Sequence, residues 1–308
     1  MSLAFVFPGQ GSQSIGMLKD LAEAESVVEQ TFKHASDALG YDLWNIIQEG
    51  PQEKLNSTDI TQPALLSAGV ACWKVWQQKT DVQPAVFAGH SLGEYTALVC
   101  AGVLDFADAV KLVEVRGQYM QQAVPEGQGG MAAILGLEDA KVLEACEQAA
   151  EGDVLQAVNF NSPGQVVVAG SKAAIERIVE VAKEMGAKRA LPLPVSVPSH
   201  CDLMKPAADK LADKLQSVTF NQASIPVINN VDVAVETDAD KIRDALVRQL
   251  YNPVRWVETI QKMAADGVTE LVECGPGRVL VGLNKRIDKG MSAAAVYDPT
   301  SFEKVLSA

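Results

Sequence analysis

Histidine, basic residues and long apolar runs are all scarce in this sequence of 308 residues. It has three histidines, and 39 aspartates and glutamates outnumber 26 lysines and arginines, which gives a net charge of −13. Nucleic acids and anionic membranes attract basic surfaces, so this charge argues against either as the main partner. No apolar run approaches the length of a membrane span, and the first one is too short for a secretory signal. We therefore expect a cytoplasmic protein that binds neither nucleic acid nor membrane.

Cysteine is also sparse and carries no pattern. The five cysteines are widely separated, odd in number and never spaced as Cys-x-x-Cys. Disulfide frameworks and zinc sites depend on paired or closely spaced cysteines, so neither is indicated. We expect reduced thiols and no metal centre. The 48% hydrophobic and 21% charged content is that of an ordinary globular protein, long enough for one large domain or two smaller ones.

The first glycine-rich loop lacks the residues of a nucleotide site. The stretch 5–17 reads FVFPGQGSQSIGM, a short apolar run followed by a turn. A dinucleotide fingerprint needs Gly-x-Gly-x-x-Gly, but the third position here is Ser14. A phosphate loop needs a lysine directly after its last glycine, and Lys19 does not follow Gly16. The loop must serve another purpose.

Strands alternate with helices along the chain, which predicts an α/β fold. Apolar periodicity and glycine stops mark the elements on both sides of the middle of the chain. The predicted strands here are 3–8, 85–89, 225–229 and 270–274, and the predicted helices are 22–39, 63–78, 92–100, 106–122, 203–216 and 239–250.

The middle of the chain behaves as a unit of its own. Strand, helix, strand, strand, helix and strand are predicted in that order, which is the ferredoxin-like βαββαβ arrangement. We therefore expect a small subdomain, 127–197, inserted into a discontinuous large domain, 1–126 and 198–308, with a parallel sheet and a site in the cleft between them. The elements of the insertion are 131–136, 140–150, 154–160, 165–170, 172–185 and 188–194.

A candidate nucleophile lies directly after a buried strand. The stretch 85–98, AVFAGHSLGEYTAL, places Ser91 in a Gly-x-Ser-x-Gly motif between a predicted strand and a predicted helix. That is the context of a nucleophile elbow, where flanking glycines permit a sharp turn and the helix N-terminus favours developing negative charge. The alternative is a chance occurrence of a short pattern, which the strand and helix on either side disfavour.

One histidine is placed to act as the base that a serine nucleophile needs. His34 lies one position from the apolar stripe of an exposed helix, where an ordinary surface histidine is expected. His90 adjoins Ser91, so the two side chains should diverge, and packing beneath the turn is the favoured role. By elimination His200 is the candidate base, and no carboxylate stands out as its orienting partner.

The other candidate groups would bind the substrate. Attack on an ester or thioester creates an oxyanion, for which we expect donors in the backbone N–H groups of Leu92 and of Gln10 in the glycine-rich loop. A merely structural turn is the alternative for that loop. Arg116 lies on the apolar stripe of the helix 106–122 and needs a partner there. That partner is either an internal carboxylate or a carboxylate of the substrate.

Seven motifs together resemble the malonyl-CoA:acyl carrier protein transacylase family. In chain order they are GQGSQ (9–13), TQPAL (61–65), GHSLGE (89–94), VRG (115–117), NSPGQVVVAG (161–170), VSVPSH (195–200) and ECGPG (273–277). The resemblance spans the whole chain and implies a hydrolase-like core with an inserted ferredoxin-like subdomain. It also implies ping-pong transfer of malonyl from coenzyme A to the phosphopantetheine thiol of acyl carrier protein.

The resemblance assigns roles to residues of this chain. It implies Ser91 as nucleophile, His200 as base and then acid, and the main-chain carbonyl of Gln249 as the group that orients His200. Arg116 would bind the malonyl carboxylate, the Gln10 and Leu92 amides would hold the oxyanion, and Gln62 and Asn159 would line the cleft. No cofactor is implied beyond the coenzyme A thioester, which is a substrate.

Three points stay open in the sequence. In related modular acyltransferases, Phe at the third place of the motif ending in the base histidine marks malonyl and Ser marks methylmalonyl; this chain has Ser199 there. A serine esterase or thioesterase would share the nucleophile, base and oxyanion donors. The acidic carrier protein should dock on local basic residues, for which the candidates are Lys188, Arg189, Lys285 and Arg286. We expect a monomer.

Overall fold

The computed structural model describes residues 2–195 and 197–307. Met1, Ala308 and Ser196, which belongs to the motif 195–200, lie outside the described residues. The described residues form two sheets. One is parallel, with strand order β7-β2-β1-β8-β9, and the other is antiparallel, with order β4-β5-β3-β6. The predicted fold class, α/β with a parallel sheet and a second, separate sheet, is confirmed.

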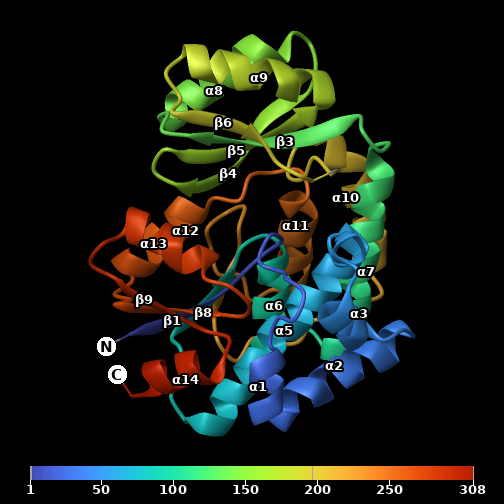
Figure 1. Cartoon of the computed structure of the whole chain (residues 1–308), viewed down its shortest axis with the longest axis vertical. Helices are drawn as coiled ribbons and strands as arrows, with labels where there is room; N and C mark the ends of the chain where they lie inside the picture. The colour runs from blue at the N-terminus through green and yellow to red at the C-terminus, as the bar shows by residue number, and fades with distance from the viewer. Residues whose placement is uncertain (1, 196, 308) are drawn as a thin grey trace.

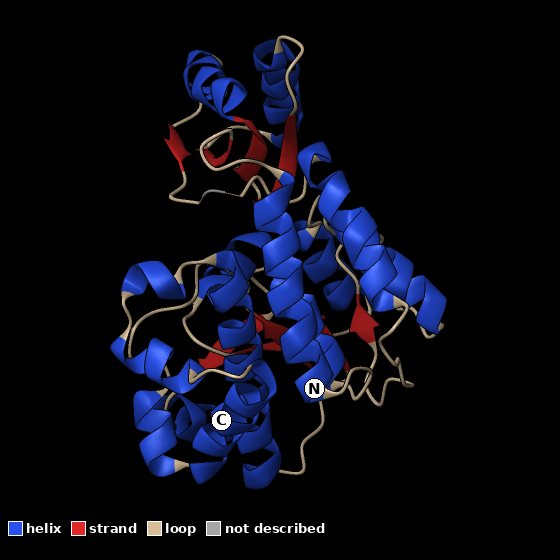
Figure 2. Cartoon of the chain, turned by 90° about the vertical axis from the view of Figure 1, so that its right-hand side faces the viewer, coloured by secondary structure: helices blue, strands red, loops and turns tan. Residues whose placement is uncertain are grey.

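The parallel sheet is enclosed by helices (Figures 1 and 2). Its strands are β1 (Leu3–Phe7), β2 (Val86–Gly89), β7 (Val227–Ile228), β8 (Glu270–Cys274) and β9 (Ser292–Val296). The helices outside the antiparallel unit are α1 (Lys19–Ala24), α2 (Ser26–Leu39), α3 (Leu43–Glu49), α4 (Gln52–Leu55), α5 (Thr58–Lys79), α6 (Leu92–Cys100), α7 (Phe106–Ala123), α10 (Lys205–Leu215), α11 (Ala239–Gln249), α12 (Trp256–Ala265), α13 (Val279–Ile287) and α14 (Pro299–Leu306), with a short 3₁₀ turn at Asp202–Met204.

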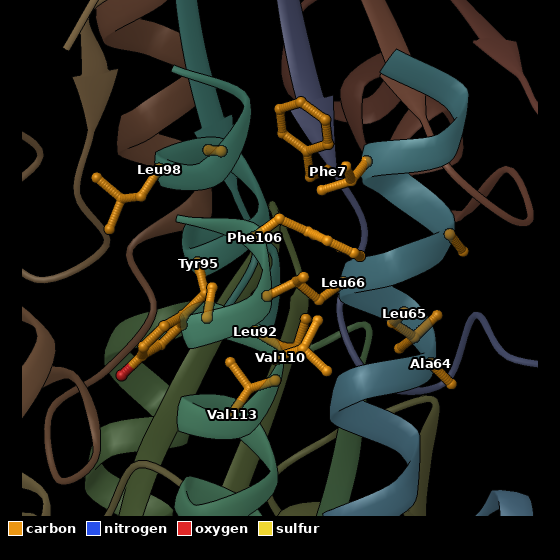
Figure 3. Close-up of a cluster of buried hydrophobic side chains, with 14 of the residues drawn as sticks. Phe7, Ala64, Leu65, Leu66, Leu92, Tyr95, Leu98, Phe106, Val110 and Val113 are labelled. Atoms are coloured by element: carbon orange, nitrogen blue, oxygen red, sulfur yellow. The ribbon is translucent and has the colours of Figure 1, made fainter. Parts of the chain in front are cut away.

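Alternation along β1 divides the core of this part into two. Phe5 and Phe7 face one side of the sheet, where they join the buried side chains of α2, α5, α6 and α7. Ala4 and Val6 face the other side and pack with residues of α12 and α13. This period of two is what a strand buried on both faces requires. Figure 3 shows how Leu92 and Tyr95 of α6 pack beside residues of α5 and α7 in the first of these clusters.

The antiparallel unit has the element order βαββαβ. It consists of β3 (Gly129–Leu135), α8 (Asp139–Ala150), β4 (Leu155–Ser162), β5 (Gln165–Ser171), α9 (Lys172–Glu184) and β6 (Arg189–Pro192). Helices α8 and α9 cover its outer face, and β4 lies nearest to α12 and α13 (Figure 1). The backbone of Val254 exchanges hydrogen bonds with Val158 and Phe160 of β4, which joins the two parts of the molecule.

Several predicted boundaries are wrong. The helix predicted over 22–39 is two helices, because Glu25 adopts an extended conformation between α1 and α2. Helix α5 begins at Thr58 rather than at residue 63 and contains Pro63. A proline costs one helical hydrogen bond, which the nearly complete burial of this helix offsets. The strand predicted over 225–229 is reduced to Val227–Ile228.

Candidate active site

Glycines let the backbone approach closely at the turn between β2 and α6. A Cβ atom on Gly89 would lie 1.8 Å from the carbonyl carbon of Gly93, and one on Gly93 would lie 2.1 Å from the carbonyl oxygen of Phe7. Ser91, between them, has φ 51° and ψ −109°, a strained conformation for a residue with a side chain. The local sequence therefore produces a sharp turn that presents the Ser91 hydroxyl.

Asn230, which lies far from this turn in the sequence, stabilises it through two hydrogen bonds. Its side-chain oxygen accepts from the Ser91 backbone N–H at 2.8 Å, and its side-chain nitrogen donates to the Gly89 carbonyl at 2.7 Å. Asn230 is completely buried in the loop after β7. Because the Ser91 N–H is already bonded, it is not available to an oxyanion. Sequence reasoning missed Asn230, since nothing in the local pattern at 225–230 links it to residue 91.

The structure brings Ser91 and His200 together. The Ser91 hydroxyl oxygen lies 2.8 Å from His200 Nε2, and His200 Nδ1 lies 2.7 Å from the main-chain oxygen of Gln249. A carbonyl only accepts, so Nδ1 carries the hydrogen and Nε2 is free to accept from the serine. Burial, with the nearby charge of Arg116, lowers the pKa of His200 to about 3. The imidazole is therefore neutral at ordinary pH, as a base must be.

His90 and His34 occupy the positions expected of structural histidines. His90 Nε2 lies 2.8 Å from the Asn161 side-chain oxygen, and its ring packs on Trp256. The bond to Asn161 joins the turn to β4, so His90 supports the position of the turn. His34 packs against Phe106 on the outer helices and is remote from the cleft.

Arg116 is buried beside the serine without a carboxylate partner. The residue is 1% exposed; Nη1 donates to Gln62 Oε1 at 2.7 Å, Nη2 donates to Gln249 Oε1 at 2.9 Å, and Nη2 lies 3.5 Å from the Ser91 hydroxyl oxygen. Its Nε has no hydrogen-bond partner among the described residues. Within 2–195 and 197–307, none of the ion pairs involves Arg116. An internal carboxylate is therefore not its partner.

Glu94 completes the buried polar groups behind the serine. It is 2% exposed, and its Oε2 accepts from the Asn230 backbone N–H at 2.9 Å and from Gln249 Nε2 at 2.8 Å. Burial raises its pKa to about 7, although these two hydrogen bonds oppose the shift. The signal in the sequence was an acidic residue in the apolar helix that follows Ser91.

A cleft of about 430 Å³ lies over these groups. Its walls come from both parts of the chain, with Gln10 and Leu92 on one side and Asn159 on the other. The backbone N–H groups of Gln10 and Leu92 have no hydrogen-bond acceptor among the described residues. Most of the predicted site residues thus meet in one cleft, which contains Ser91, His200, Arg116, Gln62, Gln10, Leu92, Asn159 and Ser199.

The basic pairs are less close together. Arg286 Nη1 donates to Gln165 Oε1 at 2.6 Å, and Gln165 lines the cleft, so Arg286 lies at its rim. Lys188 and Arg189 are exposed at the start of β6. The residues of this segment that line the cleft, 193–195, come after the other end of the strand. The two pairs therefore do not form one continuous patch at the mouth of the cleft.

The described residues contain neither a group of three or more metal-ligating side chains placed to hold an ion nor a helix long and apolar enough to cross a membrane. The fold and site together are those of an α/β enzyme whose cleft places a serine hydroxyl beside a neutral histidine and a buried arginine.

Comparison with known proteins shows to which family within this class the chain belongs. Residues 4–297 match the model of the acyl transferase domain. The chain is 63% identical to the malonyl CoA-acyl carrier protein transacylase of Escherichia coli, over 98% of each chain. It superposes with a TM-score of 0.97 on an acyl carrier protein S-malonyltransferase from Vibrio cholerae, 64% identical and covering 99% of this chain and 100% of that one. A malonyl-transacylase solved with the acyl-carrier protein of a type II PKS gives a TM-score of 0.99 at 60% identity, covering 100% and 99%.

The chain therefore has an acyl transferase domain and belongs to the malonyl-CoA:acyl carrier protein transacylase family that its seven motifs resemble, and it is an acyltransferase.

Proposed function

We propose that this chain transfers a malonyl group from malonyl-CoA to the phosphopantetheine thiol of acyl carrier protein through a malonyl ester of Ser91. The observation that carries the proposal is the buried Arg116, whose side-chain partners Gln62 and Gln249 are neutral amides. A buried guanidinium beside the reacting serine recognises a carboxylate through strong, charge-assisted hydrogen bonds. The names of the relatives support the same acyl group and the same acceptor.

The chemistry follows from the neutral His200. Its Nε2 takes the Ser91 proton while the hydroxyl oxygen attacks the thioester carbonyl, and the proton then passes to the departing coenzyme A thiol. The Gln249 carbonyl keeps the imidazole in the required tautomer by accepting from Nδ1. The carrier thiol reverses these steps, giving its proton to His200, which returns it to Ser91. The free N–H groups of Gln10 and Leu92 hold the oxyanion in both halves.

Substrate recognition is assigned to the walls of the cleft. Arg116 binds the malonyl carboxylate, and Gln62 and Asn159 line the space for the acyl group. Ser199 also lines the cleft, and serine at this place marks methylmalonyl in related modular acyltransferases. Methylmalonyl-CoA should therefore be compared with malonyl-CoA as a second acyl donor. The coenzyme A thioester is a substrate, and the reaction uses no cofactor.

Carrier docking and organisation are part of the proposal. The acidic carrier protein meets Lys285 and Arg286 at the rim, and Lys188 and Arg189 contribute a second basic region on the small subdomain. We assign residues 1–126 and 198–308 to the large domain and 127–197 to the small one. The enzyme works as a monomer in the cytoplasm.

A serine esterase or thioesterase is the rival function, because it uses the same nucleophile, base and oxyanion donors. A hydrolase has no general need of a buried arginine beside the nucleophile. The two functions also differ in the molecule that removes the acyl group from the serine, since a transferase uses the thiol of its acceptor and a hydrolase uses water.

The decisive experiment is the intact mass of the protein after incubation with malonyl-CoA. The wild type should gain the mass of one malonyl group. This adduct should persist in buffer alone and disappear faster after holo acyl carrier protein is added. Ser91→Ala should fold and gain no adduct. An adduct on that variant would remove Ser91 from its role, and rapid loss of malonyl to water without a thiol would favour the hydrolase.

A further inference from the structure

Two buried charges share one neutral amide behind Ser91. Arg116 Nη2 donates to Gln249 Oε1 at 2.9 Å, and Gln249 Nε2 donates to Glu94 Oε2 at 2.8 Å. Arg116 and Glu94 are 1% and 2% exposed. Among the described residues neither side chain has an ion-pair partner within 4.0 Å. The two opposite charges are therefore linked through one amide, and no ion pair among the described residues neutralises either of them.

An incoming carboxylate would upset this balance. Under the proposed function, the malonyl carboxylate binds against Arg116, so the cluster then holds two negative charges and one positive charge. An uncompensated charge in a buried site is costly, and buried groups usually avoid the cost by changing protonation. A neutral acyl group such as acetyl adds no charge and leaves the cluster balanced.

We propose that Glu94 takes up one proton from solvent when a malonyl group is loaded onto Ser91, and releases it when the group leaves. The inference rests on the proposed function. The transfer itself moves the Ser91 proton to the departing thiol through His200, so the proton on Glu94 is an additional one supplied by water. It is a positioning residue of the acid-binding site, because it acts on the acyl group through Gln249 and Arg116.

A small cavity borders Glu94. Its volume is about 10 Å³, which is close to the space one water molecule requires. Apolar side chains, Asn229 and Glu236 complete its lining. None of the residues that line this cavity lines the acyl cleft, and Gln249 does not line it either. A water molecule in this cavity would therefore meet Glu94 outside the acyl cleft.

The groups around Glu94 leave it as the residue expected to titrate. Its pKa is raised to about 7 by burial, and the charge of Arg116 holds that value down. A malonyl carboxylate would cancel that influence and raise the pKa further. The pKa of His200 is lowered to about 3 and that of Tyr95 is raised to about 12, both far from neutrality. The titratable or charged groups facing Glu94 are Arg116 from α7, Tyr95 from α6, Asp232 after β7 and Glu236 across the cavity.

The test compares malonyl with acetyl in the same protein. The acylated fraction is measured by intact mass after equilibration with each acyl-CoA and free coenzyme A between pH 6 and 9. From these fractions we obtain an equilibrium constant for malonyl loading and one for acetyl loading. In the ratio of the two constants, the pH dependence that comes from the coenzyme A thiol and from other groups common to both reactions cancels. Proton linkage predicts that the wild-type ratio falls as pH rises, by roughly fivefold or more between pH 7 and 8.5.

Two variants assign the proton. Glu94→Gln keeps an acceptor oxygen for the Asn230 N–H and Gln249 Nε2, so the turn should be preserved, and its malonyl-to-acetyl ratio should not change with pH. Glu236→Gln removes a carboxylate from the same cavity without contacting Gln249, and it should keep the wild-type slope. If Glu94→Gln does not fold, proton uptake on wild-type malonylation, followed with an indicator dye and compared with acetylation, gives the same test.

The outcomes are separable. A wild-type ratio that is independent of pH overturns the inference, as does equal proton uptake with both acyl groups. If the malonyl-to-acetyl ratio of folded Glu94→Gln still falls as pH rises, the proton binds to another group, with His200 the nearest candidate. That result also overturns the inference. A wild type that gains no malonyl adduct at any pH refutes the proposed function instead.

Discussion

Replacing Gln62 by glutamate would give Arg116 an internal carboxylate. Gln62 is 1% exposed, and its Oε1 accepts from Arg116 Nη1 at 2.7 Å. Its Nε2 lies 3.5 Å from the sulfur of Met120, so the substitution exchanges a weakly bonded amide nitrogen for an oxygen of similar size. The new carboxylate would pair with the guanidinium and compete with the carboxylate of the substrate.

The expected loss is that of one charge-assisted hydrogen bond to the acyl group. Such bonds contribute about 1.5–3 kcal/mol. At about 1.4 kcal/mol per tenfold change, kcat/KM for malonyl loading should fall roughly 10- to 150-fold. Acetyl loading should change little, because acetyl has no carboxylate to bind.

The assay is the rate of acyl-enzyme formation from malonyl-CoA and from acetyl-CoA. Gln62→Met is the matched control, because it removes the acceptor but adds no charge, and it should keep most of the preference for malonyl. Equal losses for both acyl groups in Gln62→Glu would mean that the residue supports the fold of the site, and the assignment of Arg116 as the carboxylate receptor would be wrong.

Three further predictions follow from the contacts. Gly89→Ala should destabilise the protein by about 3 kcal/mol or more in urea unfolding, because its Cβ would meet Gly93 at 1.8 Å; Gly282→Ala, with open space around its Cβ, should be neutral or slightly stabilising. Reversing Lys285 and Arg286 to Glu should slow transfer to acyl carrier protein mainly at low salt, and equal kinetics at low ionic strength would place the docking surface elsewhere. Glu94 binds its proton more tightly when folded, with a pKa of about 7 against an ordinary value of 4.5, so its contribution to stability is lost as pH rises through that window. Glu94→Gln should therefore gain about 3 kcal/mol of unfolding free energy relative to wild type between pH 4.5 and 8, and an unchanged difference between the two proteins would contradict the pKa.

Local patterns were sufficient for the turn that carries Ser91. The Gly-x-Ser-x-Gly motif, the buried strand before it and the helix after it are all contained in residues 85–98. The choice of His200 was also possible, because only three histidines were present and the other two had ordinary structural explanations. Element boundaries were less predictable. Helix α5 starts before Pro63, because tertiary burial outweighs the local preference against proline.

The sequence by itself determined the α/β class, the sharp turn at Ser91 and the need of Arg116 for a partner, because periodicity, glycine spacing and a charge on an apolar stripe are local properties. Only the tertiary structure decided what that partner is. Gln62 and Gln249 lie 54 and 133 positions from Arg116, and Glu94 is joined to Gln249 across 155 positions. Hydrogen bonds over such separations depend on how the helices pack against the sheet, which no local pattern encodes. The same packing placed two neutral amides around the guanidinium and kept the nearest carboxylate one amide away.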